Sequence, residues 1–292
     1  MVHGFLNIDK PAGLTSHDVV ARVRRIARQT RVGHAGTLDP AATGVLVVGL
    51  GLATRLIEYV HQAAPKRYRA VVQLGVTTTT DDAEGEVVAT APVPPIDPTD
   101  LKRALERFQG PILQVPPMYA ALHHNGQRLY ELARAGVVVE RPARPVTIDR
   151  LELLDWAPPL ATIDVQCSAG TYIRALARDL GVALGCGAHL RSLRRTAVGS
   201  FVIDEAVPLA GLESDAAALA THLLPPERAI AEWPAITLRA DEAQRVQHGQ
   251  ALQRADIPGA RARAHMLDGR LLAVLIHEGD VWRPEKVFDW TA

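Results

Sequence analysis

The 292-residue sequence predicts an α+β protein that consists of one large domain and one small β domain. Its hydrophobic content of 48% is sufficient for a substantial core, and its length favours more than one domain. Strand-like and helix-like stretches are interspersed as far as residue 232, whereas short apolar runs between glycine and polar turns follow Trp233. We therefore expect domains at residues 1–232 and 233–292.

The N-terminal sixty residues predict two strands and two helices. A short strand over residues 4–9 leads into a turn, and Ser16 is expected to cap an amphipathic helix over residues 17–30. The apolar run at 45–50 predicts a buried strand, and a helix is expected over 53–62.

The glycine-rich loop at residues 33–44 is the feature around which we organise this domain, because it contains Asp39. Its three glycines permit backbone conformations and close approaches that other residues exclude, and Pro40 biases Asp39 toward an extended backbone. The strand expected at 45–50 would anchor the loop in rigid structure. Asp39 is therefore a candidate reaction centre, although Asp39-Pro40 is also compatible with an ordinary turn.

The middle of the chain predicts a strand, a helix and an insertion. Residues 66–74 alternate as a strand does, with Tyr68 on the face opposite the neighbouring arginines. After a proline-rich connector, Thr99 is expected to cap a helix over residues 100–108. Residues 115–145 read as a protruding insertion with a short helix at 129–135, bracketed by prolines and basic residues.

Two strands and a helix complete the large domain. Strands are expected at 147–154 and 161–168, followed by a helix that opens at residues 169–171. Tyr172 and Arg174 occupy its first turn. The N-terminal end of a helix beside a glycine commonly faces a site, so both are candidates for a functional role.

Charge is balanced overall, with 32 basic and 32 acidic residues, which argues against nonspecific coating of nucleic acid. Residues 1–80 nevertheless contain ten lysines and arginines against four acidic residues, and Arg191, Arg194 and Arg195 form a second basic cluster. Each cluster alone is compatible with a solvated surface. Because the two flank one candidate site, they favour contact with a polyanion.

The remaining composition narrows the class of protein. Cys167 and Cys186 have no spacing typical of a disulfide framework or a zinc site, so we expect buried thiols and no metal. The sequence has neither a membrane-length apolar run nor a secretory leader. We therefore expect a cytoplasmic protein without membrane contact.

Five motifs follow one another along residues 4–230. They are Asp9–Ser16, Gly33–Pro40, Lys66–Arg69, Gly170–Arg174 and Cys186–Leu190. In this order they resemble the TruB family of tRNA pseudouridine synthases, and the tail after Trp233 is similar to the PUA domain of bacterial members. The resemblance implies the pseudouridine synthase fold, a mixed, largely antiparallel sheet with flanking helices.

The resemblance also implies an activity, the isomerisation of uridine 55 in the T-arm of tRNA to pseudouridine without cofactor or metal. It implies a monomer that acts on the T-arm stem-loop without a protein partner. Asp39 aligns with the catalytic aspartate, and Tyr68 with a tyrosine that packs on the flipped base. Arg174 aligns with the arginine that pairs with the aspartate, which a charge-assisted contact would keep ionised and oriented.

Other positions acquire binding roles from the same resemblance. His34 aligns with the histidine that enters the RNA loop when the uridine leaves the stack, and Tyr172 and Leu193 align with residues that line the uracil pocket. The unequal charge adds RNA-binding candidates, which are Lys10, Arg24, Arg25 and Arg194. His123 stands where the family has a lysine and Ala169 where a basic residue is frequent, so RNA contacts at these two positions are expected to differ.

Two other classes of protein remain as alternatives. One is an RNA-binding or RNA-folding protein that retains the fold without turnover, and the other is an unrelated hydrolase that uses Asp39. The intact set of Asp39, Tyr68 and Arg174 favours the enzyme. A hydrolase would need a second carboxylate as acid, and no motif supplies one. The route of catalysis, by attack on the base, attack on the ribose or glycal formation, stays open.

Overall fold

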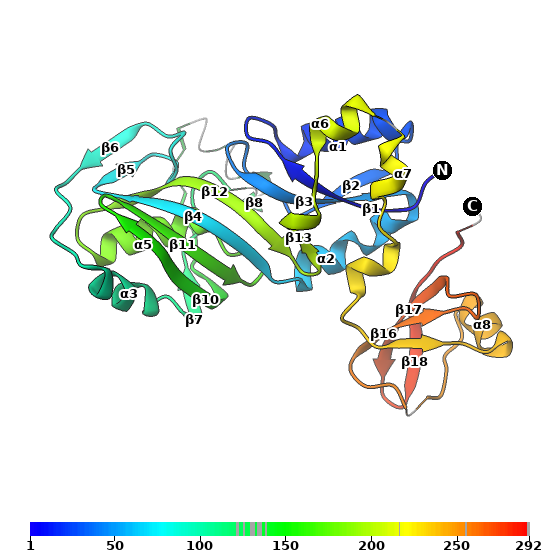
Figure 1. Ribbon diagram of the computed structural model, residues 1–292. Helices are drawn as coiled ribbons and strands as arrows, with labels where there is room; N and C mark the ends of the chain where they lie inside the picture. The colour runs from blue at the N-terminus through cyan, green and yellow to red at the C-terminus, as the bar shows by residue number, and fades with distance from the viewer. Residues whose placement is uncertain are drawn as a thin grey trace.

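The structure is a computed structural model that describes residues 1–290 except 121–122, 125, 129–131, 133–135, 138, 216 and 255. A 10-stranded sheet forms its body (Figure 1). The strands of this sheet are β1 (Gly4–Lys10), β2 (Val32–Ala35), β3 (Thr43–Leu50), β4 (Lys66–Leu74), β7 (Gly110–Gln114), β10 (Arg144–Ala157), β11 (Leu160–Cys167), β12 (Ala188–Val198), β13 (Phe201–Val202) and β14 (Val207–Pro208).

The order of strands is β14-β1-β3-β12-β4-β11-β10-β7, with β2 paired to β3 and β13 to β12. Pairing is antiparallel except between β1 and β14 and between β3 and β12. The β3–β12 contact joins the two halves of the sheet, and Arg195 lies there beside Gly44. A Cβ at Gly44, whose φ is +100°, would stand 2.2 Å from the Arg195 carbonyl oxygen, so this junction requires glycine.

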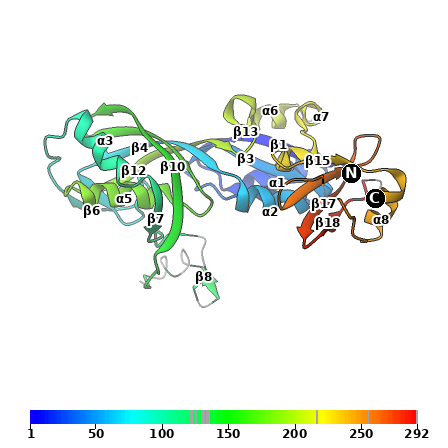
Figure 2. The same ribbon diagram turned by 90° about the horizontal axis from the view of Figure 1, so that it is seen from below.

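Helices flank the sheet. They are α1 (Ser16–Ala27), α2 (Ile57–Ala63), α3 (Pro98–Glu106), α5 (Ile173–Ala183), α6 (Leu209–Ser214) and α7 (Ala218–His222), with 3₁₀ turns η1 (Gly51–Leu56), η2 (Ile203–Glu205) and η3 (Pro226–Ile230). Figure 2 shows α3 and α5 at one end of the elongated sheet and α1, α2, α6 and α7 at the other. Separate apolar cores lie under α5 and under α1.

Two small two-stranded sheets lie outside the 10-stranded sheet. They are β5 (Val76–Thr78) with β6 (Val87–Thr90), and β8 (His123–His124) with β9 (Gln127–Arg128). The second hairpin belongs to the predicted insertion (Figure 2). The helix predicted at 129–135 lies almost entirely outside the described residues.

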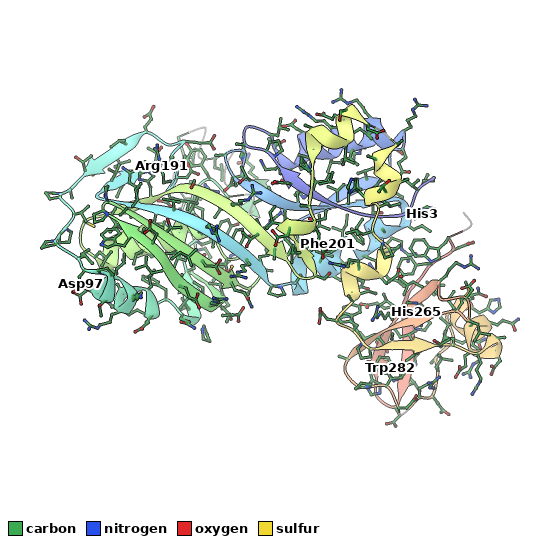
Figure 3. All side chains as sticks on the ribbon, in the orientation of Figure 1. His3, Asp97, Arg191, Phe201, His265 and Trp282 are labelled. Atoms are coloured by element: carbon green, nitrogen blue, oxygen red, sulfur yellow. The ribbon has the colours of Figure 1, made fainter. Side chains whose placement is uncertain are left out.

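The C-terminal part forms its own four-stranded sheet, β15-β16-β17-β18, beside helix α8. These elements are β15 (Ala235–Thr237), β16 (Arg261–His265), β17 (Leu271–Glu278), β18 (Val281–Val287) and α8 (Ala240–Gln247). Trp282 is completely buried in its core (Figure 3). Leu271 and Phe288 instead pack in a core shared with Phe5 and Val45, so apolar contacts join the two parts. The predicted α+β class, with its mixed, largely antiparallel sheet and small C-terminal β domain, is confirmed.

Several predicted helix starts were wrong. Thr15, not Ser16, caps α1, since its hydroxyl accepts from the Asp18 amide and the Asp18 carboxylate accepts from Thr15. Asp97, not Thr99, caps α3 and allows Pro98 to stand in the first turn (Figure 3 labels Asp97). Neighbouring residues of similar capping ability compete, and the backbone path decides between them.

Two further helices begin later than predicted. The helix expected at 53–62 starts as the 3₁₀ turn η1 and becomes α-helical only at Ile57. The helix expected to open at 169–171 begins at Ile173, with Tyr172 as its N-cap residue. Cys167 and Cys186 are buried free thiols, as predicted. None of the helices in the described ranges is long and apolar enough to cross a membrane.

Candidate active site

Asp39 lies in the loop between β2 and β3, and several polar contacts shape this loop. The Ser16 hydroxyl accepts from the Leu38 amide at 2.9 Å and donates to the Leu38 carbonyl at 3.2 Å. The Gly13 amide donates to the Pro40 carbonyl at 2.9 Å. Ser16 thus supports the backbone of the Asp39 loop instead of capping a helix, and the first motif of the sequence stabilises the second.

Lys10 is enclosed in the same loop contacts. Its ammonium donates to the carbonyl oxygens of Pro11, Leu14 and Pro40 at 2.7–3.1 Å, and the residue is fully buried. Burial lowers its pKa to about 8, and nearby Asp39 opposes that shift. The prediction of Lys10 as a surface RNA contact does not fit this position, because its donors already serve the loop.

Arg174 of α5 forms an ion pair with Asp39, with 3.0 Å between Nε and Oδ2. The same guanidinium lies 3.5 Å from Asp82 and donates to the carbonyl oxygens of Thr80 and Tyr119. Arg174 is 5% exposed, whereas 41% of the Asp39 side chain remains accessible. Burial raises the pKa of Asp39, and Arg174 limits the rise.

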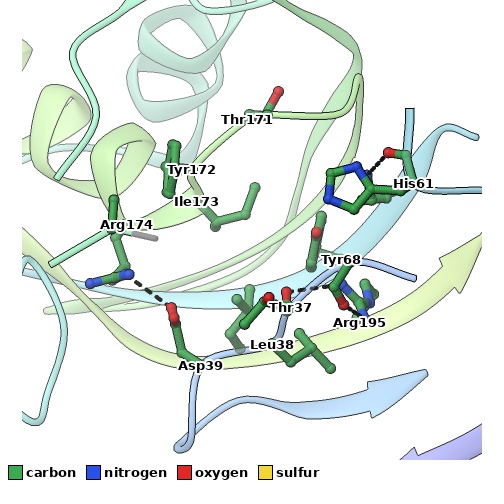
Figure 4. Close-up of a pocket in the computed structure, with 15 residues that line it drawn as sticks. Thr37, Leu38, Asp39, His61, Tyr68, Thr171, Tyr172, Ile173, Arg174 and Arg195 are labelled. Carbon is green, nitrogen blue, oxygen red and sulfur yellow. Dashed lines mark hydrogen bonds and ion pairs between the residues drawn. The ribbon is translucent and has the colours of Figure 1, made fainter. Parts of the chain in front are cut away.

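A cavity of about 360 Å³ opens beside this ion pair (Figure 4). Asp39, Tyr68, Tyr172, Arg174 and Leu193, predicted from distant segments of the sequence, all line it. Among the described lining residues, Asp39 is the sole carboxylic acid. Its size, and a lining that combines aromatic and apolar side chains with charged and hydroxyl groups, suit a small polar ring such as a nucleobase.

Tyr68 stands on β4 opposite Arg195 of β12 and is 7% exposed. Burial raises the pKa of the Tyr68 phenol, and the Arg195 guanidinium opposes this. Arg195 is itself buried and donates to the carbonyl oxygens of Gly36, Thr37 and Val45 at 2.8–3.4 Å. It therefore links Tyr68 to the Asp39 loop.

Sequence reasoning treated Arg195 as part of a surface cluster and missed this role. The sequence did contain a signal for this position. Arg195 lies two residues after Leu193, and residues two apart on a strand share a face, so Arg195 could have been predicted on the same side as Leu193. The sequence analysis also did not identify Gln114, at the end of β7, as part of the site. The buried Gln114 amide accepts from the Tyr172 amide at 2.8 Å and donates to the Tyr172 carbonyl at 3.1 Å, which fixes Tyr172 before α5.

His34 lies on β2 and does not belong to the lining of the cavity. Its ring meets the ring of His17 edge-on, with 5.3 Å between centroids. Burial is the main cause that lowers the pKa of His34 to about 4, so its imidazole is neutral near pH 7. A neutral ring suits stacking better than phosphate contact.

The other predicted RNA contacts lie outside the cavity. Arg25 is exposed, while the Arg24 guanidinium donates to the Val32 carbonyl at 2.9 Å. Arg194 pairs with Asp9 at 2.8 Å and remains 43% exposed. Ala169 is partly exposed before α5, and His123 lies in β8, where its side chain is outside the described part.

Known protein families match most of the chain. The TruB family pseudouridylate synthase N-terminal domain matches residues 24–173, and the tRNA pseudouridylate synthase B C-terminal domain matches residues 174–231. The C-terminal domain of tRNA pseudouridine synthase II matches residues 233–289.

Similar proteins agree with these matches. The chain is 47% identical over 262 residues to tRNA pseudouridine synthase B of Pseudomonas paraeruginosa, covering 88% of this chain and 86% of the relative. It is 46% identical over 290 residues to the protein of the same name from Dehalococcoides mccartyi, covering 98% and 96%. A solved Cbf5-Nop10-Gar1 complex contains a chain with a TM-score of 0.76 and 27% identity, covering 98% of this chain and 85% of that one.

Fold and sequence together define an enzyme of the pseudouridine synthase class, an isomerase. The chain belongs to the TruB family of pseudouridylate synthases.

Proposed function

We propose that this enzyme isomerises uridine 55 in the T-arm of tRNA to pseudouridine, with Asp39 as its catalytic carboxylate. Relatives named tRNA pseudouridine synthase B support the substrate. The observation that carries the proposal is the Asp39–Arg174 ion pair at 3.0 Å, which faces Tyr68 across one cavity. The arrangement holds a carboxylate where a ribose can reach it and provides aromatic walls for a base.

The reaction breaks the bond between N1 of uracil and C1′ of ribose and forms a bond between C5 and C1′. One proton leaves C5 and N1 gains one, so atoms and charge balance without an oxidant or a cofactor. A carboxylate at Asp39 can trap or stabilise the electron-poor sugar carbon that forms when the base departs, as carboxylates do in glycosidases. Attack on the base and formation of a glycal remain alternative routes.

Tyr68 is the proposed group that packs against the base and accepts the C5 proton. Its buried phenol resists ionisation, and the adjacent Arg195 reduces that resistance. Tyr172 and Leu193 form walls for the uracil, and His34, outside the cavity, fills the gap that the extruded uridine leaves in the RNA stack. Arg174 orients Asp39 and keeps it from neutralisation by burial.

The division of the chain at residue 232 is part of the proposal. Residues 1–232 carry catalysis, with the insertion at 115–145 gripping the RNA, and residues 233–292 form an RNA-binding domain similar to PUA. The enzyme acts as a monomer on the folded T-arm in the cytoplasm. A folded loop is recognised mainly by its shape, and contacts to the preformed loop offset the cost of extrusion.

Tritium release tests the proposed function directly. A T-arm stem-loop carrying uridine tritiated at C5 should release tritium with the wild-type enzyme and nearly none with Asp39→Asn. Binding of the stem-loop without release by the wild-type protein would instead identify the RNA-binding or RNA-folding alternative. Release at a normal rate by Asp39→Asn would remove Asp39 from the catalytic role.

A further inference from the structure

The cavity has a second polar end, and the roles given above involve only Arg195 there, as a neighbour of Tyr68. Lys66 and Arg195 line it together with His61, whose pKa burial lowers so that its imidazole is a neutral hydrogen-bonding group, and we call the three residues the cationic wall. In Figure 4, His61 and Arg195 lie on one side of Tyr68, and the Asp39–Arg174 ion pair lies on the other. The three residues come from α2, β4 and β12, so tertiary contacts assemble the wall.

Lys66 has fewer hydrogen-bond acceptors for its charged group than Arg195 has in the cationic wall. It is 6% exposed, and its ammonium donates to the His61 carbonyl at 3.1 Å. Burial lowers its pKa to about 8, and the charge of Arg195 adds to this shift. Within the described ranges, no carboxylate forms an ion pair with any of the three residues.

Other cations near the site, which are buried or half-buried, have more polar partners than Lys66. Lys10 donates to three carbonyl oxygens, whereas Arg174 and Arg178 each pair with aspartates. Lys66 has three N–H donors and one described acceptor, so donors remain for a ligand. An unpaired charge held in a buried position costs stability, and such costs commonly persist at functional sites.

We propose that the cationic wall binds a backbone phosphate of the RNA next to the extruded uridine. This inference rests on the proposed function, because a nucleotide whose ribose faces Asp39 carries one phosphate on each side of that ribose. Lys66 supplies the direct hydrogen bond, and the exposed imidazole of His61 contributes a second. Arg195, whose donors hold carbonyl oxygens, contributes charge without contact.

The test starts with the variant Lys66→Met, which keeps an unbranched side chain one atom shorter and removes the charge. It should lower kcat/KM on the T-arm stem-loop roughly 10- to 100-fold, as expected for the loss of a charge-assisted hydrogen bond. Its Tm at pH 7 should equal or exceed that of the wild type, because the charge that is removed is buried and unpaired. Lys66→Arg should retain most activity. Lys102→Met, a matched change at an exposed lysine of α3, should change neither value.

A double-mutant cycle identifies the ligand. Two stem-loops carry a neutral methylphosphonate either 5′ or 3′ of the target uridine. At one position the modification should slow the wild type as much as Lys66→Met does, and should then slow Lys66→Met by only about 2-fold or less. Additive losses at both positions, or a Lys66→Met enzyme with wild-type kcat/KM, would overturn the phosphate site.

Failure of this inference is distinguishable from failure of the proposed function. If the wild type forms pseudouridine, Asp39→Asn does not, and the cycle is additive, the function stands and the phosphate site falls. If the wild type forms no pseudouridine, the proposed function falls, and the phosphate site can still be tested by measuring RNA binding. Lys66→Met should then reduce the slope of log affinity against log salt for the stem-loop by about one, and an unchanged slope would reject the site.

Discussion

The Nε atom of Arg174 lies 3.0 Å from Oδ2 of Asp39, and the remaining nitrogens of this guanidinium contact Asp82 and the carbonyl oxygens of Thr80 and Tyr119. Helix α5 therefore positions the Asp39 carboxylate through an arginine whose three guanidinium nitrogens all have polar partners. Since a guanidinium is planar and always charged, these contacts fix the orientation of the Arg174 side chain and keep its positive charge beside Asp39. The orientation of Asp39 depends on this packing.

Asparagine at Asp39 should separate catalysis from stability. Burial raises the Asp39 pKa, so the folded state binds the proton more tightly than the unfolded state does. The unfolded-state pKa of this carboxyl group is 3.8 and the folded-state pKa is higher. As the pH rises from 3.8 through the folded-state pKa, ionisation of Asp39 therefore lowers the free energy of unfolding. Asp39→Asn should show a Tm at pH 7 equal to or above that of the wild type, with turnover nearly abolished. A clearly lower Tm measured by calorimetry would contradict this.

Arg174 and Arg178 offer a matched pair one turn apart on α5. Arg174→Met should lower kcat about 100-fold, the scale of losses from small misplacement of a reacting group. It should also move the acid limb of the pH–rate profile upward, because Arg174 opposes the rise in the Asp39 pKa. Arg178→Met removes a comparable ion pair, to Asp81 at 3.0 Å, away from the carboxylate.

We expect Arg178→Met to keep kcat within a few-fold of the wild type and leave the acid limb in place. Single-turnover formation of pseudouridine, followed across pH for both variants, provides the measurement. Equal losses in the two variants would mean that Arg174 acts through the stability of α5 and not through Asp39.

His34 should make stability depend on pH below neutrality. Burial lowers its folded-state pKa from 6.5 to about 4, so the unfolded chain binds a proton first as the pH falls. Stability should decline between about pH 6.5 and 4, and His34→Phe should decline less. Comparing Tm at pH 8, where histidine is neutral in both states, isolates the packing effect. The same difference in Tm at pH 8 and pH 5 would refute this assignment.

Surface arginines should differ in their share of RNA binding. Arg25 is exposed, so Arg25→Ala should reduce the slope of log affinity against log salt by about one while kcat stays unchanged. Smaller changes are expected for Arg24→Ala and Arg194→Ala, because these side chains already contact Val32 and Asp9. Titrations of a T-arm stem-loop with the Asp39→Asn protein, which is expected to be inactive, measure the slopes. A slope that no variant alters would exclude these contacts.

The sequence by itself determined the local features of the site. Alternation along residues 66–74 places Tyr68 on the buried face of β4, and three glycines with Pro40 specify a shaped loop around Asp39. The order of five motifs identified the family. These features could be predicted because they depend on neighbours along the chain, whose periodicity and turn chemistry the sequence records.

Tertiary structure alone decided which charged groups are enclosed and what they face. Lys10, Lys66 and Arg195 resemble surface cations in the sequence, yet each is buried by segments far away in the chain. Thr15 and Ser16 are chemically similar, and only the position of Leu38 makes one a cap and the other a loop brace. Burial and pairing depend on contacts between distant elements, and a local pattern does not contain that information.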